Sequence, residues 1–116
     1  MRAAIIGSRN FEDMSLLEKT MSDYADSISE VVSGGARGAD SLGAAWAKSR
    51  GIPTNIFLPE WDKYGRGAGF VRNKLIVENS DIIFAFWDGI SKGTKSSMDM
   101  AAMIGKKIVV IKTDAN

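Results

Sequence analysis

The chain has 116 residues, 45% of them hydrophobic and 25% charged, which suits one compact domain over residues 1–116 and excludes a disordered chain. Its 15 Lys and Arg against 14 Asp and Glu give a formal charge of +1, without the basic excess typical of non-specific nucleic-acid binding. The chain contains no Cys and no His, which excludes disulfides, thiolate nucleophiles, Cys-based metal centres and histidine bases.

Strand and helix patterns alternate along the whole chain. In order, they predict a strand at 3–6, a helix at 14–28, a strand at 31–32, a helix at 39–51, a strand at 56–58, a helix at 71–80, a strand at 82–87, a helix at 98–105 and a strand at 108–111. Ser15 and Glu18 fit a capping box for the first helix. Residues 60–69 have turn composition and predict a long loop.

This alternation predicts an α/β fold. Strands joined through helices pair in parallel by right-handed crossovers, so we expect a Rossmann-like three-layer sandwich: a five-stranded parallel sheet with helices on both faces. Ligands in such sheets bind beyond the carboxyl ends of the strands. The site is therefore predicted in the loops after the first, second and fourth strands.

The loop after the first strand is Gly7-Ser8-Arg9-Asn10. Glycine permits a tight turn or close approach to a ligand, the Ser8 hydroxyl can hydrogen-bond, and the Arg9 guanidinium suits phosphate or carboxylate. The alternative is a tight turn that carries a solvated arginine.

The strongest local motif follows the second strand, where Ser33-Gly34-Gly35-Ala36-Arg37-Gly38 precedes a helix. A helix N-terminus presents unpaired amides and a partial positive charge, so this loop predicts a phosphate site. The motif is neither Walker A nor Gly-x-Gly-x-x-Gly. Asp40 either accepts ribose hydroxyls or caps the helix.

Residues 87–95, Trp-Asp-Gly-Ile-Ser-Lys-Gly-Thr-Lys, repeat this logic before the last helix. Ser91 and Thr94 are also candidate helix caps. Between these motifs, Trp61 and Tyr64 stand among glycines and cations, ahead of Arg72 and Asn73. That segment is either a lid over a base and a phosphate, or packs Trp61 against the helical layer.

These motifs predict the ligand-binding residues. They are Gly7, Ser8, Arg9, Ser33, Gly34, Gly35, Ala36, Arg37, Asp40, Arg72, Asn73, Trp87, Asp88, Gly89, Ser91, Gly93, Thr94 and Lys95. If the protein is an enzyme, the catalytic candidates are Arg72, Asp40 and Asp88. No metal ligand is predicted.

Taken together, the four ordered motifs at residues 6–13, 32–40, 61–73 and 86–94 resemble the YspA/YpsA-type branch of the SLOG superfamily. The resemblance implies a Rossmann-like domain for nucleotides or nucleotide-derived ligands. Relatives include the LOG phosphoribohydrolases, the single-strand DNA-binding DprA proteins, and sensor domains for NAD-derived signals in anti-phage systems.

The resemblance is incomplete at one catalytic position. In LOG enzymes a Pro-Gly-Gly-x-Gly-Thr-x-x-Glu segment supplies a glutamate that acts with an upstream arginine. Arg72 aligns with that arginine and Gly93-Thr94 with the Gly-Thr, but Ser97 stands in place of the glutamate. Asp99 comes two residues later, on a different predicted helical face. Because glycosidic hydrolysis needs such carboxylates, we expect binding rather than turnover.

The main hypothesis is a cytoplasmic sensor or sequestering protein for a nucleotide or an NAD- or ADP-ribose-derived signal, in phage defence or counter-defence. One alternative is a phosphoribohydrolase that uses Arg72 with Asp40 or Asp88. Another is single-stranded nucleic-acid binding through Arg37, Arg66, Arg72 and Lys95, which the charge of +1 weakens.

Expectations about partners are broader. No apolar stretch reaches the roughly 20 residues of a membrane span and no signal-like segment begins the chain, so no membrane partner is expected. No cofactor is required, although Mg²⁺ could join ligand phosphates through Asp88. A homo-oligomer is expected, with Trp46, Trp61 and Tyr64 as interface candidates.

Overall fold

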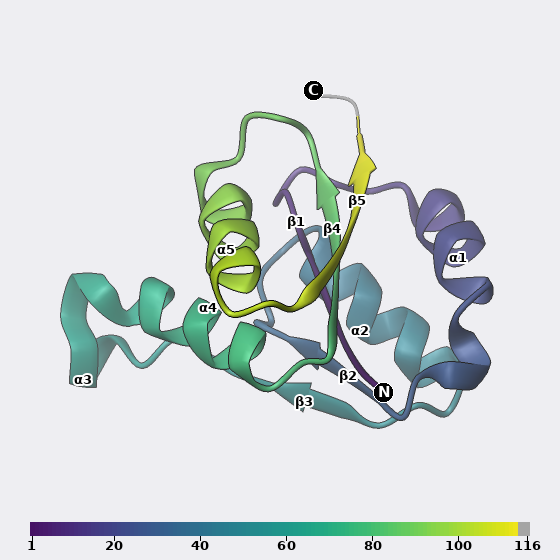
Figure 1. Ribbon diagram of the computed structural model, residues 1–116, viewed down its shortest axis with the longest axis horizontal. Helices are drawn as coiled ribbons and strands as arrows, with labels where there is room; N and C mark the ends of the chain where they lie inside the picture. The colour runs from purple at the N-terminus through teal and green to yellow at the C-terminus, as the bar shows by residue number, and fades with distance from the viewer. Residues whose placement is uncertain (114–116) are drawn as a thin grey trace.

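The computed structural model describes residues 1–113, which form a parallel sheet between two helical layers (Figure 1). The sheet has five strands in the order β3-β2-β1-β4-β5. The elements are β1 (Arg2–Gly7), α1 (Met14–Ser22), β2 (Glu30–Ser33), α2 (Ala39–Ser49), β3 (Thr54–Ile56), α3 (Trp61–Tyr64), α4 (Ala68–Glu78), β4 (Ile82–Trp87), α5 (Lys92–Met103) and β5 (Lys107–Lys112), with 3₁₀ turns at Ala25–Ser27 and Gly65–Gly67. This confirms the predicted Rossmann-like α/β sandwich. None of the helices within residues 1–113 has the length and apolar character to cross a membrane.

The alternation of side chains along β1 explains the three layers. Ala3 and Ile5 join the core formed with α1 and α2, whereas Ala4 and Ile6 join the core formed with α4 and α5. All four are buried because β1 lies between β2 and β4 in the sheet. An unbroken apolar run is therefore what this strand requires, and it is what the sequence has.

Aromatic packing fixes the turn after β1 against β4. The Phe11 ring lies 5.0 Å from that of Phe86, and Tyr24 meets Phe84 edge-on at 4.8 Å, each measured between ring centroids. Such aromatic pairs add about 0.5–1.5 kcal/mol beyond the burial of their area. The turn that carries Arg9 is thus anchored from its far side.

The first helix begins at Met14 as predicted, but its predicted cap and its predicted end were wrong. Asp13, rather than Ser15, caps α1: its carboxylate accepts a hydrogen bond of 3.0 Å from the amide of Leu16. The helix ends at Ser22 instead of continuing to Ile28, and residues 25–27 form a 3₁₀ turn. Asp13, two residues before Ser15, caps the helix in place of the Ser-x-x-Glu pattern.

The predicted long loop at residues 60–69 was also wrong. It contains α3, a 3₁₀ turn and the start of α4, and Figure 1 shows α3 projecting from the body of the domain. Trp61 is 57% exposed, so it does not pack into a helical layer. The preceding strand covers Thr54–Ile56 rather than residues 56–58, since it pairs with β2 only over those residues.

One of the three candidate interface residues is excluded. Trp46 is 1% exposed and belongs to the core between α2 and the sheet, so it cannot contact a second chain. Trp61 and Tyr64 remain exposed. The prediction of a homo-oligomer therefore depends on these two aromatics alone.

Gly43 provides a test of the packing between α2 and β1. A Cβ atom at this helical position would lie 2.7 Å from Cγ2 and 2.8 Å from Cβ of Ile5. We expect Gly43→Ala to lower the free energy of unfolding, because overpacking costs about 1–3 kcal/mol and exceeds the roughly 1 kcal/mol gained in helix propensity. Urea denaturation measures the difference.

Gly69→Ala is the matched control for this measurement. Gly69 is also helical, but the nearest atom to its added Cβ lies 4.0 Å away, on Trp61. Its stability should stay unchanged or rise by up to about 1 kcal/mol. Equal effects of the two substitutions would show that α2 does not approach β1 as closely as described.

Candidate ligand-binding site at the carboxyl end of the sheet

The topology creates a switch point between β1 and β4. From β1 the chain winds through β2 to β3 on one side, then returns to β4 on the other side of β1. The loops that follow these two neighbouring strands lead to helices on opposite faces of the sheet (Figure 1), which opens a gap between them. The predicted site should lie here.

A crevice of about 200 Å³ occupies this position. It is lined by residues from the end of β1, the glycine-rich loop after β2, and helices α4 and α5. The lining residues are Ile6, Gly7, Arg9, Ala36, Asp40, Gly69, Arg72, Asn73, Ile76, Ser91, Gly93, Thr94 and Ser97. The tertiary structure thus brings together the two glycine-rich helix starts.

The turn after β1 is structural as much as functional. A Cβ at Gly7 would lie 2.3 Å from the carbonyl oxygen of Phe86, so only glycine fits between β1, β4 and α2. Ser8 is buried: its amide donates to the Phe86 carbonyl at 3.2 Å, and its carbonyl accepts from the amides of Phe11 and Ala39. Its hydroxyl accepts from Asp88 N at 3.4 Å. Ser8 therefore ties the two switch-point loops together and does not line the crevice.

The glycine-rich loop after β2 uses its own side chains to satisfy its amides. The amide of Gly35 donates to the Ser33 hydroxyl at 3.2 Å, and that of Ala36 donates to Oδ2 of Asp40 at 3.3 Å. Ser41 Oγ donates to the Ala36 carbonyl at 2.6 Å. Two amides that the sequence pattern assigned to a ligand are thus engaged within the protein.

The start of α5 is different, because it lacks a side-chain cap. Ser91 occupies the N-cap position but makes no hydrogen bond to the helix amides; its hydroxyl lies 3.1 Å from that of Thr94. Gly93 has open space where a Cβ would be. Amides in a first helical turn have no partner within the helix, so this end of the crevice can receive an anion.

Arg72 faces the crevice from α4. Its Nη1 donates to the Gly34 carbonyl at 2.7 Å and its Nε donates to Oδ1 of Asn73 at 2.8 Å. Partial burial lowers the pKa of Arg72, while nearby Asp40 opposes that change. Within residues 1–113, Nη2 makes no hydrogen bond and remains a donor for a ligand.

Asp40 is the most perturbed acid of the site. It is 7% exposed, and burial raises the pKa of Asp40 to about 6, although the Ala36 amide and the Arg72 charge pull it down. A Cβ atom added at Gly34 would lie 2.7 Å from Arg72 Nη1 and 2.8 Å from Asp40 Oδ2. The guanidinium and the carboxylate therefore both pack against the backbone of Gly34. Perturbed acids of this kind gather at functional sites.

Asp88 has a structural position. Its Oδ1 accepts from the amides of Ile90 and Ser91 at 2.8 Å each, and these bonds lower the pKa of Asp88. It shapes the turn before α5 without lining the crevice. Trp87 likewise turns away: its indole donates to the Ser91 carbonyl at 3.0 Å and lies beneath Lys112.

Half of the predicted binding residues line the crevice. They are Gly7, Arg9, Ala36, Asp40, Arg72, Asn73, Ser91, Gly93 and Thr94. The others lie behind the wall or elsewhere: Ser8, Ser33, Gly34, Gly35, Arg37, Trp87, Asp88, Gly89 and Lys95. Arg37 lines a second cavity, and Lys95 pairs with Asp99 at 2.7 Å on the exposed face of α5.

The sequence did not predict Gly69, Ile76 or Ser97 as lining residues. Gly69 and Ile76 carry no chemical motif, and only the position of α4 reveals them. Ser97 was noted because it stands where LOG enzymes have glutamate, and the structure places it in the crevice wall, 4% exposed. Asp99, exposed and paired with Lys95, lies outside that wall, as its helical phase indicated.

The fold and the crevice together define a Rossmann-like α/β domain with a polar, cation-bearing pocket at its switch point. The model of the YspA, cpYpsA-related SLOG family matches residues 1–64, more than half of the chain. The chain belongs to this family. The match covers β1 to α3, while α4 and α5 contribute their side of the crevice from outside it.

Two further proteins are similar to this chain. The Gene 61 protein of Mycobacterium phage D29 is 29% identical over 117 aligned residues, which cover 93% of this chain and 94% of the phage protein. The X-ray structure of DNA processing protein A (DprA) from Streptococcus pneumoniae superposes with a TM-score of 0.81 at 19% identity. That superposition covers 97% of this chain and 50% of the DprA chain, and it shows a shared fold.

The buried carboxyl of Asp40 predicts a pH-dependent stability. A pKa raised from 3.8 to about 6 means that the folded state binds the proton more tightly than the unfolded state. Stability should therefore fall as pH rises from about 4 to 6, and the full cost, roughly 2–3 kcal/mol, is present above pH 6. Asp40→Asn should be more stable than wild type by about 2 kcal/mol at pH 8 and nearly equal at pH 4. Urea unfolding at both pH values measures this.

Asp62→Asn is the control, because Asp62 is exposed on α3. It should leave the stability close to that of wild type, because it removes no buried group. An Asp40→Asn protein that is less stable than wild type at pH 8 would mean that the attraction between the Asp40 carboxylate and the Arg72 charge outweighs the cost of burial.

Proposed function

We propose that this domain binds a nucleotide-derived ligand and places one of its phosphates in the crevice. The observation that carries the proposal is the uncapped N-terminus of α5 facing Arg72 across one small cavity. Helix amides and a guanidinium are complementary to a phosphate in charge and in hydrogen bonding. Arg9 adds a second cation to the same wall.

Asp40 supports the assignment of a sugar next to this phosphate. Its carboxylate lines the crevice and is an acceptor for ribose hydroxyls, a role that acidic residues near phosphate-binding turns perform in Rossmann folds. Within the described residues, no group of three His, Cys, Asp or Glu side chains could hold a metal. Any Mg²⁺ would therefore depend on the ligand's phosphates, because Asp88 lies outside the crevice and accepts from the amides of Ile90 and Ser91.

Binding without turnover fits the residues of α5. Ser97 in the crevice wall carries no carboxylate, and Asp99 is directed to Lys95 instead. A domain of this kind acts as a sensor or as a sequestering protein. The ligand class that we propose is a nucleotide or an NAD- or ADP-ribose-derived signal.

Substitution at Gly93 tests the phosphate site with little structural cost. Because a Cβ at Gly93 meets no atom within 4 Å, both Asp and Asn fit there. An aspartate in the first turn of α5 favours the helix but repels a phosphate. We expect Gly93→Asp to weaken AMP or ADP-ribose binding by about 10- to 100-fold, the size of a lost charge-assisted contact. Calorimetric titration measures the affinities.

Gly93→Asn has the same shape without the charge and serves as the control. It should bind within about threefold of wild type, since the cost of repulsion is absent. Equal weakening by both substitutions would indicate a steric effect. The absence of binding by wild type to any phosphorylated ligand would refute the proposed function.

A second candidate is hydrolysis of an N-glycosidic bond, because one observation favours it. Asp40, with a pKa of about 6 in the crevice beside Arg72, can exchange a proton near neutral pH, as a general acid or base must. In this candidate reaction Arg72 holds the phosphate. Water adds to the sugar carbon and the base leaves with a proton.

Chromatography after incubation with AMP separates the two candidates. We expect AMP to remain intact with wild-type protein, since among residues 1–113 no carboxylate besides that of Asp40 lines the crevice. Release of adenine by wild type that disappears in Asp40→Asn and persists in Asp62→Asn would establish the hydrolase instead.

The nucleic-acid hypothesis receives less support from the arrangement of its four cations. Arg72 is half-buried in the crevice, Lys95 is paired with Asp99, and Arg37 lines a different cavity. Arg66 belongs to the 3₁₀ turn before α4. These cations do not form one continuous strip along which a strand would lie.

A further inference from the structure

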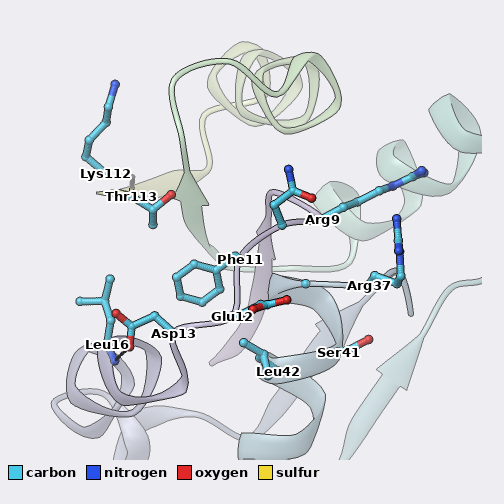
Figure 2. Close-up of a pocket in the computed structure, with 12 residues that line it drawn as sticks. Arg9, Phe11, Glu12, Asp13, Leu16, Arg37, Ser41, Leu42, Lys112 and Thr113 are labelled. Carbon is cyan, nitrogen blue, oxygen red and sulfur yellow. Dashed lines mark hydrogen bonds between the residues drawn. The ribbon is translucent and has the colours of Figure 1, made fainter. Parts of the chain in front are cut away.

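A second and larger cavity lies on the α1 and α2 side of the switch point. Its volume is about 830 Å³, against about 200 Å³ for the crevice. Figure 2 shows Phe11 in its middle, with Lys112 on one side and Arg9 and Arg37 on the other. None of the functions discussed above uses this space.

The chemistry of the larger cavity suits an anionic ligand with a flat or apolar part. Among residues 1–113, neither Arg9 nor Arg37 takes part in an ion pair, and both are exposed. The lining includes apolar side chains: Phe11, buried and held against Phe86, and the half-buried Leu16 and Leu42. Unpaired guanidiniums beside apolar side chains combine an attraction for phosphate with a surface for a ring.

Acidic groups also line this cavity and shape what it can accept. Glu12 is exposed and makes no ion pair within residues 1–113, so its carboxylate is an acceptor for hydroxyl groups. Asp13 is engaged in capping α1. The wall therefore offers cations at one place and a hydroxyl acceptor at another, as a sugar phosphate requires.

Arg9 is common to the two cavities, because it is among the residues that line each of them. Between them the turn after β1 touches the start of α2: the amide of Ala39 donates to the Ser8 carbonyl at 3.3 Å. A Cβ at Gly38 would lie 2.2 Å from that carbonyl oxygen, so the two loops are in direct contact. A ligand leaving the crevice toward α1 must pass along Arg9.

The crevice is too small to hold a whole nucleotide-derived ligand, so such a ligand would extend beyond it. Sites for whole small molecules usually measure about 300–1,000 Å³, and 200 Å³ accommodates a phosphate with part of a sugar. The rest of a nucleotide-derived ligand needs additional space. The larger cavity, at 830 Å³, provides it across Arg9.

We propose that the ligand has two parts joined by a phosphate bridge, such as a dinucleotide or a nucleoside diphosphate sugar. One phosphate lies in the crevice and the second part lies in the larger cavity. Arg9 binds the bridge, and Arg37 and Lys112 bind the second part. This inference rests on the proposed function and specifies its ligand class.

The test compares AMP, ADP and ADP-ribose by calorimetric titration. Wild type should bind ADP-ribose at least about tenfold more tightly than ADP, because only ADP-ribose has a second part for the larger cavity. Arg37→Gln should weaken ADP-ribose about tenfold, the size of one charge-assisted hydrogen bond, and should change AMP less than about twofold. Lys112→Gln should act in the same direction. Both side chains are exposed, so both variants should fold.

Two controls make the outcomes distinct. Arg66→Gln removes an exposed arginine outside both cavities and should change nothing. Arg72→Gln should weaken AMP and ADP-ribose alike, since it acts in the crevice.

The inference of a two-part ligand is overturned if ADP-ribose binds no better than ADP, or if Arg37→Gln affects AMP and ADP-ribose equally. In either case AMP binding that is sensitive to Gly93→Asp still supports the proposed function. If no ligand binds wild type, both the proposed function and this inference fail.

Discussion

The contact between the turn after β1 and the first residues of α2 is the constraint on which the site depends. The Ser8 carbonyl accepts the amides of Phe11 and Ala39, and Gly7 and Gly38 have no room for a side chain at this junction. A junction of backbone against backbone has no freedom to adjust, so it places three loops at fixed positions around the switch point. Residues from both sides of this contact line the crevice and the larger cavity.

The two glycine-rich helix starts have different physical roles although they look alike in sequence. The loop before α2 is rigid because Ser33 and Asp40 accept hydrogen bonds from its amides. Arg72 also donates a hydrogen bond to the carbonyl of Gly34 in this loop. The start of α5 has no such internal acceptor from its N-cap Ser91. The loop before α2 has amides hydrogen-bonded within the protein, and it lies beside the uncapped N-terminus of α5. This arrangement suits binding of a ligand in one orientation, because little of the backbone has to reorganise on binding.

Asp40 shows what this arrangement costs. A carboxylate that is 7% exposed loses most of its hydration, and neither the Ala36 amide nor Arg72 compensates fully, as its raised pKa indicates. A neutral residue at this position would give a higher free energy of unfolding. An acid of this kind, buried and only partly compensated at the wall of a cavity, is typical of functional sites.

The sequence by itself determined the layer order, because buried strands such as residues 82–87 need apolar side chains on both faces and helices need apolar residues on one. It also located the loops that line the crevice, since their glycines and Arg72 can be recognised from the sequence alone. Only the tertiary structure decided which of these residues share a cavity. The packing of segments distant in sequence places Gly69 and Ser97 in the crevice wall and buries Trp46. Such packing depends on contacts across the chain, whereas the patterns in a sequence report mainly on neighbours within one turn or one strand.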